Sequence, residues 1–85
     1  MLYTIIKENT YQDSIVLMLL SNKLSAIDGV NQVSIMMGTP ANKDIFKSSG
    51  FDTAELDNAK PNDIVVIVDT DDESKVDEAV SYTHL

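Results

Sequence analysis

A chain of 85 residues without cysteine is expected to form one domain, and it excludes a disulfide framework and a thiolate metal site. Its net charge of −8, from 14 acidic and 6 basic residues, disfavours nucleic acid and anionic membranes as partners. No segment has the apolar length that a bilayer span requires, and the first residues lack the pattern of a secretory signal. We therefore expect a cytoplasmic protein.

The first half of the chain predicts a strand, a long helix and a second strand. Alternating faces indicate a strand over residues 2–6. A helix is expected over residues 11–27, with Thr10 and Asp13 as its capping box. Its apolar residues at helical spacing are Val16, Leu20, Leu24 and Ile27. Residues 15–20 are apolar nearly all round the helix, so we expect a second surface to cover it besides its own sheet. Residues 30–37 predict the second strand.

The second half predicts a short helix, a strand and a last helix. Thr39 is the expected cap of the short helix, and Phe51 is expected to pack back on Phe46 after a left-handed Gly50. Residues 64–68 are all β-branched, which predicts a strand buried on both faces between the other two. The last helix is expected to begin near Asp71. We interpret all three glycines as stop signals at element ends.

This order of elements fits two folds. We predict an α+β, ferredoxin-like β-α-β-(short α)-β-α sandwich that lacks its final strand. The alternative is an α/β, Rossmann-like sheet of three parallel strands. The short, weakly apolar helix after Thr39 favours the first fold, because it resembles an insertion between paired antiparallel strands. The absent strand would leave residues 2–6 as an open, apolar edge.

The sequence carries no catalytic signature and no metal motif. Its single histidine, His84, lies in a polar tail and is expected to be a disordered surface residue. Residues 69–73 are acidic apart from Thr70, but they lack the glycine and the distant glutamate of a calcium loop. We therefore predict no catalytic residue and no metal ligand.

Two turns are candidate binding or interface segments. One follows the second strand and offers Gly38, Thr39, Asn42 and Lys43 at a helix N-terminus, where an anion or a neighbouring domain would bind. The other precedes the apolar helix and contributes the residues Tyr11, Asp13 and Ser14. Ordinary helix capping is the alternative for both turns and is favoured after Gly38, where Pro40 removes one of the N–H groups that an anion would need; Tyr11 is then expected to pack on the sheet edge.

The same segments carry a resemblance to a known family. They read Tyr11-Gln12-Asp13-Ser14 with Leu17-Met18, Val33-Ser34-Ile35-Met36-Met37-Gly38-Thr39-Pro40-Ala41-Asn42-Lys43, and Pro61-Asn62-Asp63. In this order they resemble the amino-terminal region of the FdrA family over about residues 1–80. Full-length members are similar to the CoA-binding subunit of succinyl-CoA synthetase, and some are associated with an oxamate carbamoyltransferase system in purine catabolism. No catalytic residue is carried over, because the CoA-binding and ligase-like domains follow this region.

The resemblance implies an accessory domain, for assembly or gating, of a CoA-ligase-like enzyme subunit. Its expected partners are the downstream domains and partner subunits, and acyl-CoA or carbamoyl-transfer chemistry would belong to those domains. We expect no cofactor in this chain, although CoA would suit the full-length parent. A ferredoxin-like module that senses a small molecule is the alternative, and a self-contained enzyme is the least favoured. Residues 1–80 would form the domain and residues 81–85 a non-native or disordered tail.

Overall fold

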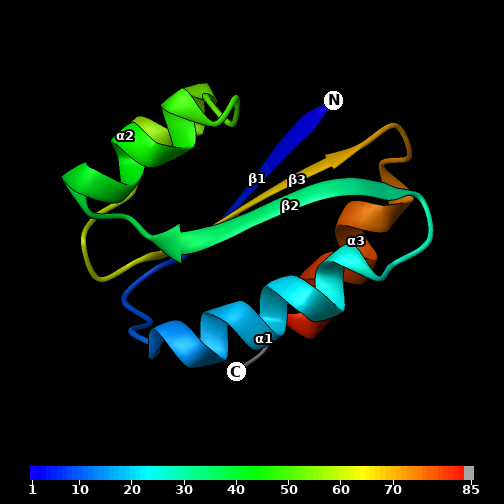
Figure 1. Ribbon diagram of the computed structural model, residues 1–85, viewed down its shortest axis with the longest axis horizontal. Helices are drawn as coiled ribbons and strands as arrows, with labels where there is room; N and C mark the ends of the chain where they lie inside the picture. Colours follow the sequence, from blue (N-terminus) through cyan, green and yellow to red (C-terminus); the bar gives the residue numbers. More distant parts are fainter. Residues whose placement is uncertain (84–85) are drawn as a thin grey trace.

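The computed structural model describes residues 1–83, in which a three-stranded sheet lies between helices (Figure 1). The elements in chain order are β1 (Leu2–Lys7), α1 (Ser14–Ser25), β2 (Val30–Met37), α2 (Pro40–Ser48), the 3-10 helix η1 (Ala54–Asn58), β3 (Ile64–Thr70) and α3 (Ser74–Tyr82). Each of these helices is too short or too polar to span a bilayer.

The sheet has the order β1-β3-β2, and β3 pairs antiparallel with both neighbours. Leu2 lies opposite Asp69 on one side of β3, and Met37 lies opposite Ile64 on the other. β1 and β2 are thus parallel to each other, joined across β3 by α1, which is a split β-α-β unit. The ferredoxin-like prediction is confirmed, and the parallel Rossmann-like alternative is wrong. Among the described residues β1 and β2 form the two edges.

β3 is the most buried strand, as its run of β-branched residues predicted. Ile64 to Val68 expose at most 1% of their surface. The strand continues two residues beyond the predicted end, to Thr70, which is also buried. Thr70 hydroxyl donates to the carbonyl oxygen of Gly29 at 2.7 Å, so this buried polar group stabilises the turn that leads into β2.

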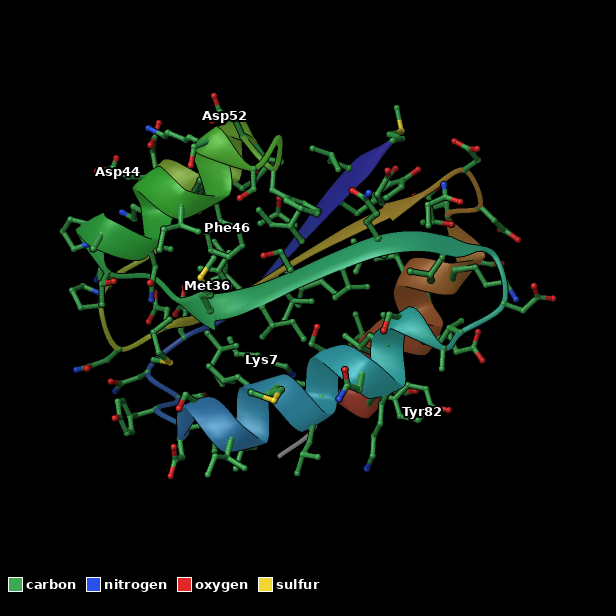
Figure 2. All side chains as sticks on the ribbon, viewed as in Figure 1. Lys7, Met36, Asp44, Phe46, Asp52 and Tyr82 are labelled. Atoms are coloured by element: carbon green, nitrogen blue, oxygen red, sulfur yellow. The ribbon has the colours of Figure 1, made fainter. Side chains whose placement is uncertain are left out.

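Helices cover both faces of the sheet. The helices α1 and α3 lie on one face and α2 lies on the other (Figure 1). The first pair packs against Val66 and Val68 of β3, and α2 with η1 packs against Val65 and Ile67. The fully buried side chain of α2 is Phe46, which lies beside Met36 of β2 (Figure 2). The short helix expected as an insertion therefore covers the second face of the sheet with a core of its own.

Helix α1 begins three residues later than predicted. Thr10 donates its hydroxyl to Glu8 carbonyl and caps nothing, so the predicted capping box is wrong. Asp13 is the cap instead, with an extended backbone and a side chain that accepts the N–H of Ile15. The buried stripe contains Leu17, Leu20 and Leu24, whereas Val16 is only half-buried.

The predicted end of α2 is confirmed as a Schellman motif. Phe51 N–H donates to Phe46 carbonyl at 2.8 Å, and Gly50 N–H donates to Lys47 carbonyl at 3.3 Å. Gly50 has a φ of 85°, which glycine adopts without strain. Phe51 also packs in the core cluster of Phe46.

Helix α3 begins at Ser74, later than the predicted start near Asp71. The Asp72 carboxylate accepts the hydroxyl and the N–H of Ser74 at 2.7 and 3.0 Å, and these bonds lower the pKa of Asp72. At its other end the helix includes Ser81 and Tyr82, and Thr83 is buried. These residues belong to the segment 81–85 that we interpreted as a tail. His84, with its prediction, lies outside the described residues.

Candidate functional site

The turn before α1 carries three of the predicted binding residues. Asp13 is held by its capping role, with the Ser14 hydroxyl 3.3 Å from its carboxylate. Tyr11 exposes 74% of its surface and does not pack on the sheet edge, contrary to our expectation. The reason is that the helix begins only at Ser14, so Tyr11 lies in the turn before it.

The turn after β2 carries the other four. Thr39 is the cap of α2 as predicted, accepting the N–H of Asn42 at 3.2 Å. Asn42 Nδ2 donates to Met37 carbonyl at 3.0 Å, and Lys43 Nζ lies 3.4 Å from Asp57 carbonyl. Internal hydrogen bonds thus engage the polar groups of Thr39, Asn42 and Lys43.

Gly38 directly follows the last residue of β2, as predicted, but close packing is what requires glycine there. It is buried, and a Cβ atom at this position would lie 2.5 Å from the carbonyl oxygen of Lys60 and 2.9 Å from Cβ of Ala59. Its N–H donates to Asp63 carbonyl at 2.8 Å. Glycine is therefore required because the segment before β3 passes directly against the end of β2.

The two turns meet at one groove. A hollow of about 520 Å³ runs between α1 and β2, and both turns open into it. It is lined by Tyr11, Gln12, Asp13, Ser14, Leu17, Met18, Ser21, Asn22, Val33, Ser34, Ile35, Met36, Met37 and Asn42. Four of the seven predicted residues are in this set, while Gly38, Thr39 and Lys43 are not. The volume lies in the range of small-molecule pockets.

The groove is nearly uncharged. Among the described residues that line it, Asp13 is the one ionisable acid and there is no Lys or Arg. Lys43 is directed toward η1 instead. A neutral, hydrogen-bonding occupant therefore suits this groove better than an anion, because no cation is present to compensate a buried negative charge.

The sequence interpretation named Ser14 but missed the rest of the α1 side of the groove. Ser14, Met18 and Ser21 follow one another at helical spacing and share the flank of α1 that faces β2. The signal was present in the sequence as serines at positions 14 and 21, on either side of the apolar run of residues 15–20. The pairing of this flank with β2 depends on the tertiary fold, which spacing alone does not give.

A second hollow, of about 490 Å³, lies at the same end of the sheet and is lined by Glu8, Asn9, Asn58, Lys60, Pro61, Asn62 and Asp63. Asp63 is buried, and its two oxygens accept the N–H groups of Asn9 and Lys60 at 2.8 and 2.9 Å. These two bonds lower the pKa of Asp63, and the bond from Asn9 has the larger effect. Both oxygens serve the fold here, which assigns the hollow a structural role.

These features define a ferredoxin-like domain with a lateral groove. Residues 1–84 match the family described as AllF, heavy metal-associated domain, and the chain belongs to that family. It is also similar to the uncharacterized protein YahF of Escherichia coli (strain K12), with 41% identity over 64 residues. Those residues are 75% of this chain but only 12% of YahF. No solved structure matches the chain.

The residues present do not fit the soft metal that the family description suggests. The sequence has no cysteine, and the described residues contain no group of three or more His, Cys, Asp or Glu placed to hold an ion. Thioethers are the remaining soft ligands. Met36 and Met37 both line the groove, but as successive strand residues they pack into opposite clusters, and Met36 lies toward Phe46 (Figure 2). The sulfurs of Met18, Met36 and Met37 therefore do not form one set of three ligands, because Met36 packs on the opposite side of β2 from α1.

Proposed function

We propose that this chain is the accessory domain, for assembly or gating, of a CoA-ligase-like enzyme subunit of the FdrA type. The observation that carries the proposal is the outer face of α1, where Ile15 and Leu19 expose 63% and 57% of their surface. Neither residue lines the groove, and both point away from the sheet that buries Leu17 and Leu20. Exposed apolar residues grouped on one helix face are typical of a docking surface.

Two further findings support this proposal. YahF extends far beyond the matched region, which leaves room for the domains that would carry catalysis. Membership of the AllF family agrees with the resemblance to FdrA proteins and their link to purine catabolism. In this proposal the downstream domains hold CoA and perform the acyl-CoA or carbamoyl-transfer reaction, and the present domain positions or gates them through the outer face of α1.

The test is binding in trans. The 85-residue chain is titrated calorimetrically into YahF from which the matched region has been deleted. We expect saturable binding that Leu19→Glu weakens at least tenfold, because a charge would be buried in an apolar contact. Ile45→Glu is the matched control, since Ile45 is also exposed but lies on α2, across the sheet. No binding, or equal loss with both variants, would refute the assembly role.

The groove supports a second candidate function, a small-molecule sensor. Two of the predicted segments converge on it, and its volume and neutral polar lining suit a small uncharged metabolite with amide or hydroxyl groups. The melting temperature of the chain should then rise with the concentration of such a metabolite by mass action. Ser21→Leu removes a hydroxyl from the groove wall and should abolish that rise. If the domain serves only in assembly, the metabolite should leave the melting temperature of both proteins unchanged.

A further inference from the structure

The outer edge of β2 offers unpaired backbone groups to the groove. Gly38 donates its N–H to Asp63 carbonyl, directly beyond the end of the β2–β3 ladder. Alternation in an antiparallel ladder then turns the backbone groups of Met36 and Ser34 toward β3. The N–H and C=O groups of Val33 and Ile35 consequently point away from the sheet.

Asn42 limits this edge at one end. Its side-chain amide donates a hydrogen bond to the carbonyl oxygen of Met37. Met37 is the next residue of β2 whose backbone groups point away from the sheet. An added strand would thus pair with Val33 and Ile35 and stop before Met37. The centre of the available edge is Ser34, which is half-buried and lies between the two free residues.

Charge identifies the occupant of this edge. The chain carries −8, yet the sequences of α1 and β2 contain no acidic residue and a single base, Lys23. Two copies of an acidic chain repel each other least through a face that carries few of the acids, and Asp13 is the one carboxylate among the residues that line this groove. In an antiparallel pairing the N-terminal end of α1 in one copy, capped by Asp13, would also approach the C-terminal end of α1 in the other copy, which carries Lys23. The two helix dipoles would then be antiparallel, which is favourable.

We propose that a second copy of this chain binds here, with the two β2 edges pairing antiparallel about a two-fold axis near Ser34. Val33 of each copy then exchanges hydrogen bonds with Ile35 of the other, and the two sheets become continuous. The flanks of α1 that carry Met18 face each other across the seam. This interface goes beyond the proposed function, because it uses the groove side of α1 and leaves the outer face with Leu19 free.

The first test is the oligomeric state of the 85-residue chain, measured by sedimentation velocity over a range of concentrations. We expect a reversible dimer. Met18→Glu should raise its dissociation constant at least tenfold, since the two-fold axis brings the introduced charges together. Leu19→Glu is the matched control, because Leu19 is similarly exposed on the same helix but outside the groove. Circular dichroism melts confirm that both variants fold.

The second test locates the axis by disulfide trapping, which the absence of native cysteine makes unambiguous. Ser34→Cys should cross-link under mild oxidation, because a non-hydrogen-bonded pair places the two Cα atoms about 4.5 Å apart, within disulfide range. Thr4→Cys, in the other edge strand β1, should not. A monomer at every soluble concentration, equal dissociation by both glutamate variants, or cross-linking through residue 4 in place of residue 34 would overturn the proposal.

Discussion

The carboxylate of Asp63 holds the main-chain N–H of Asn9 at 2.8 Å, linking two loops that are 54 residues apart in the sequence. Asn9 has a φ of 54°, in the left-handed region that few non-glycine residues adopt. The same carboxylate fixes the N–H of Lys60, whose carbonyl oxygen lies against Gly38. The buried side chain of Asp63 thus positions the loop of Asn9, which leads to the turn before α1. It also positions Lys60, against which the turn after β2 packs.

This relationship predicts an acid-sensitive fold. The two N–H donors lower the pKa of Asp63 in the folded state below its unfolded value of about 3.9. A lowered folded pKa gives stability that is fully present above the unfolded value and is lost as the pH falls through the folded one. Asp63→Asn should melt at a lower temperature than the wild type at pH 7, and the gap should narrow below about pH 4. Asp44→Asn, at an exposed position of α2, controls for the loss of one charge.

The backbone of Asn9 gives a second prediction. Asn9→Ala should reduce the free energy of unfolding by about 1 kcal/mol, because alanine tolerates the left-handed conformation poorly. Asn9→Gly should be neutral or slightly stabilising, since glycine adopts a positive φ freely. Urea denaturation of the three proteins measures the difference. Equal losses with alanine and glycine would show that the asparagine side chain is what matters.

Gly38 and Gly50 should respond to alanine for different reasons. Gly38→Ala should cost about 1–3 kcal/mol, because its Cβ would overlap the backbone of Lys60 and force the two segments apart. Gly50→Ala has open space around its Cβ, so its cost of about 1 kcal/mol comes from the positive φ alone. Chemical denaturation gives both values. Amide shifts near Lys60 should change in Gly38→Ala only.

These residues show where sequence interpretation succeeded and where it stopped. The burial of β3, the Schellman end of α2 and the cap at Thr39 were predictable, because each depends on neighbouring residues or on a long run of one residue type. The start of α1 was predicted wrongly because Thr10 and Asp13 are both good caps, and the tertiary path through Asn9 decides between them. The role of Gly38 and the far wall of the groove depend on contacts across the fold, to Lys60 and between α1 and β2, which no local pattern encodes.

The cap of α2 is open to a direct test. Thr39→Ala should lower the free energy of unfolding by about 1 kcal/mol, because the N–H of Asn42 loses its acceptor. Thr39→Ser keeps a capping hydroxyl and should restore most of that stability. Both variants are compared by urea denaturation. A loss in serine as large as that in alanine would assign the effect to packing of the threonine methyl group.

Soft metal ions should leave the stability of this domain unchanged. Ligands that bind only the folded state raise the melting temperature by mass action, and a soft metal needs converging sulfur or imidazole ligands to do so. The sequence has no cysteine, and among the described residues the methionines around the groove point to different sides of β2. We expect no saturable shift in melting temperature with Zn²⁺ or with Cu⁺ under reducing conditions. A shift that saturates at one equivalent and is reversed by a chelator would contradict this expectation. Met18→Leu would then show whether the thioether on the groove wall takes part.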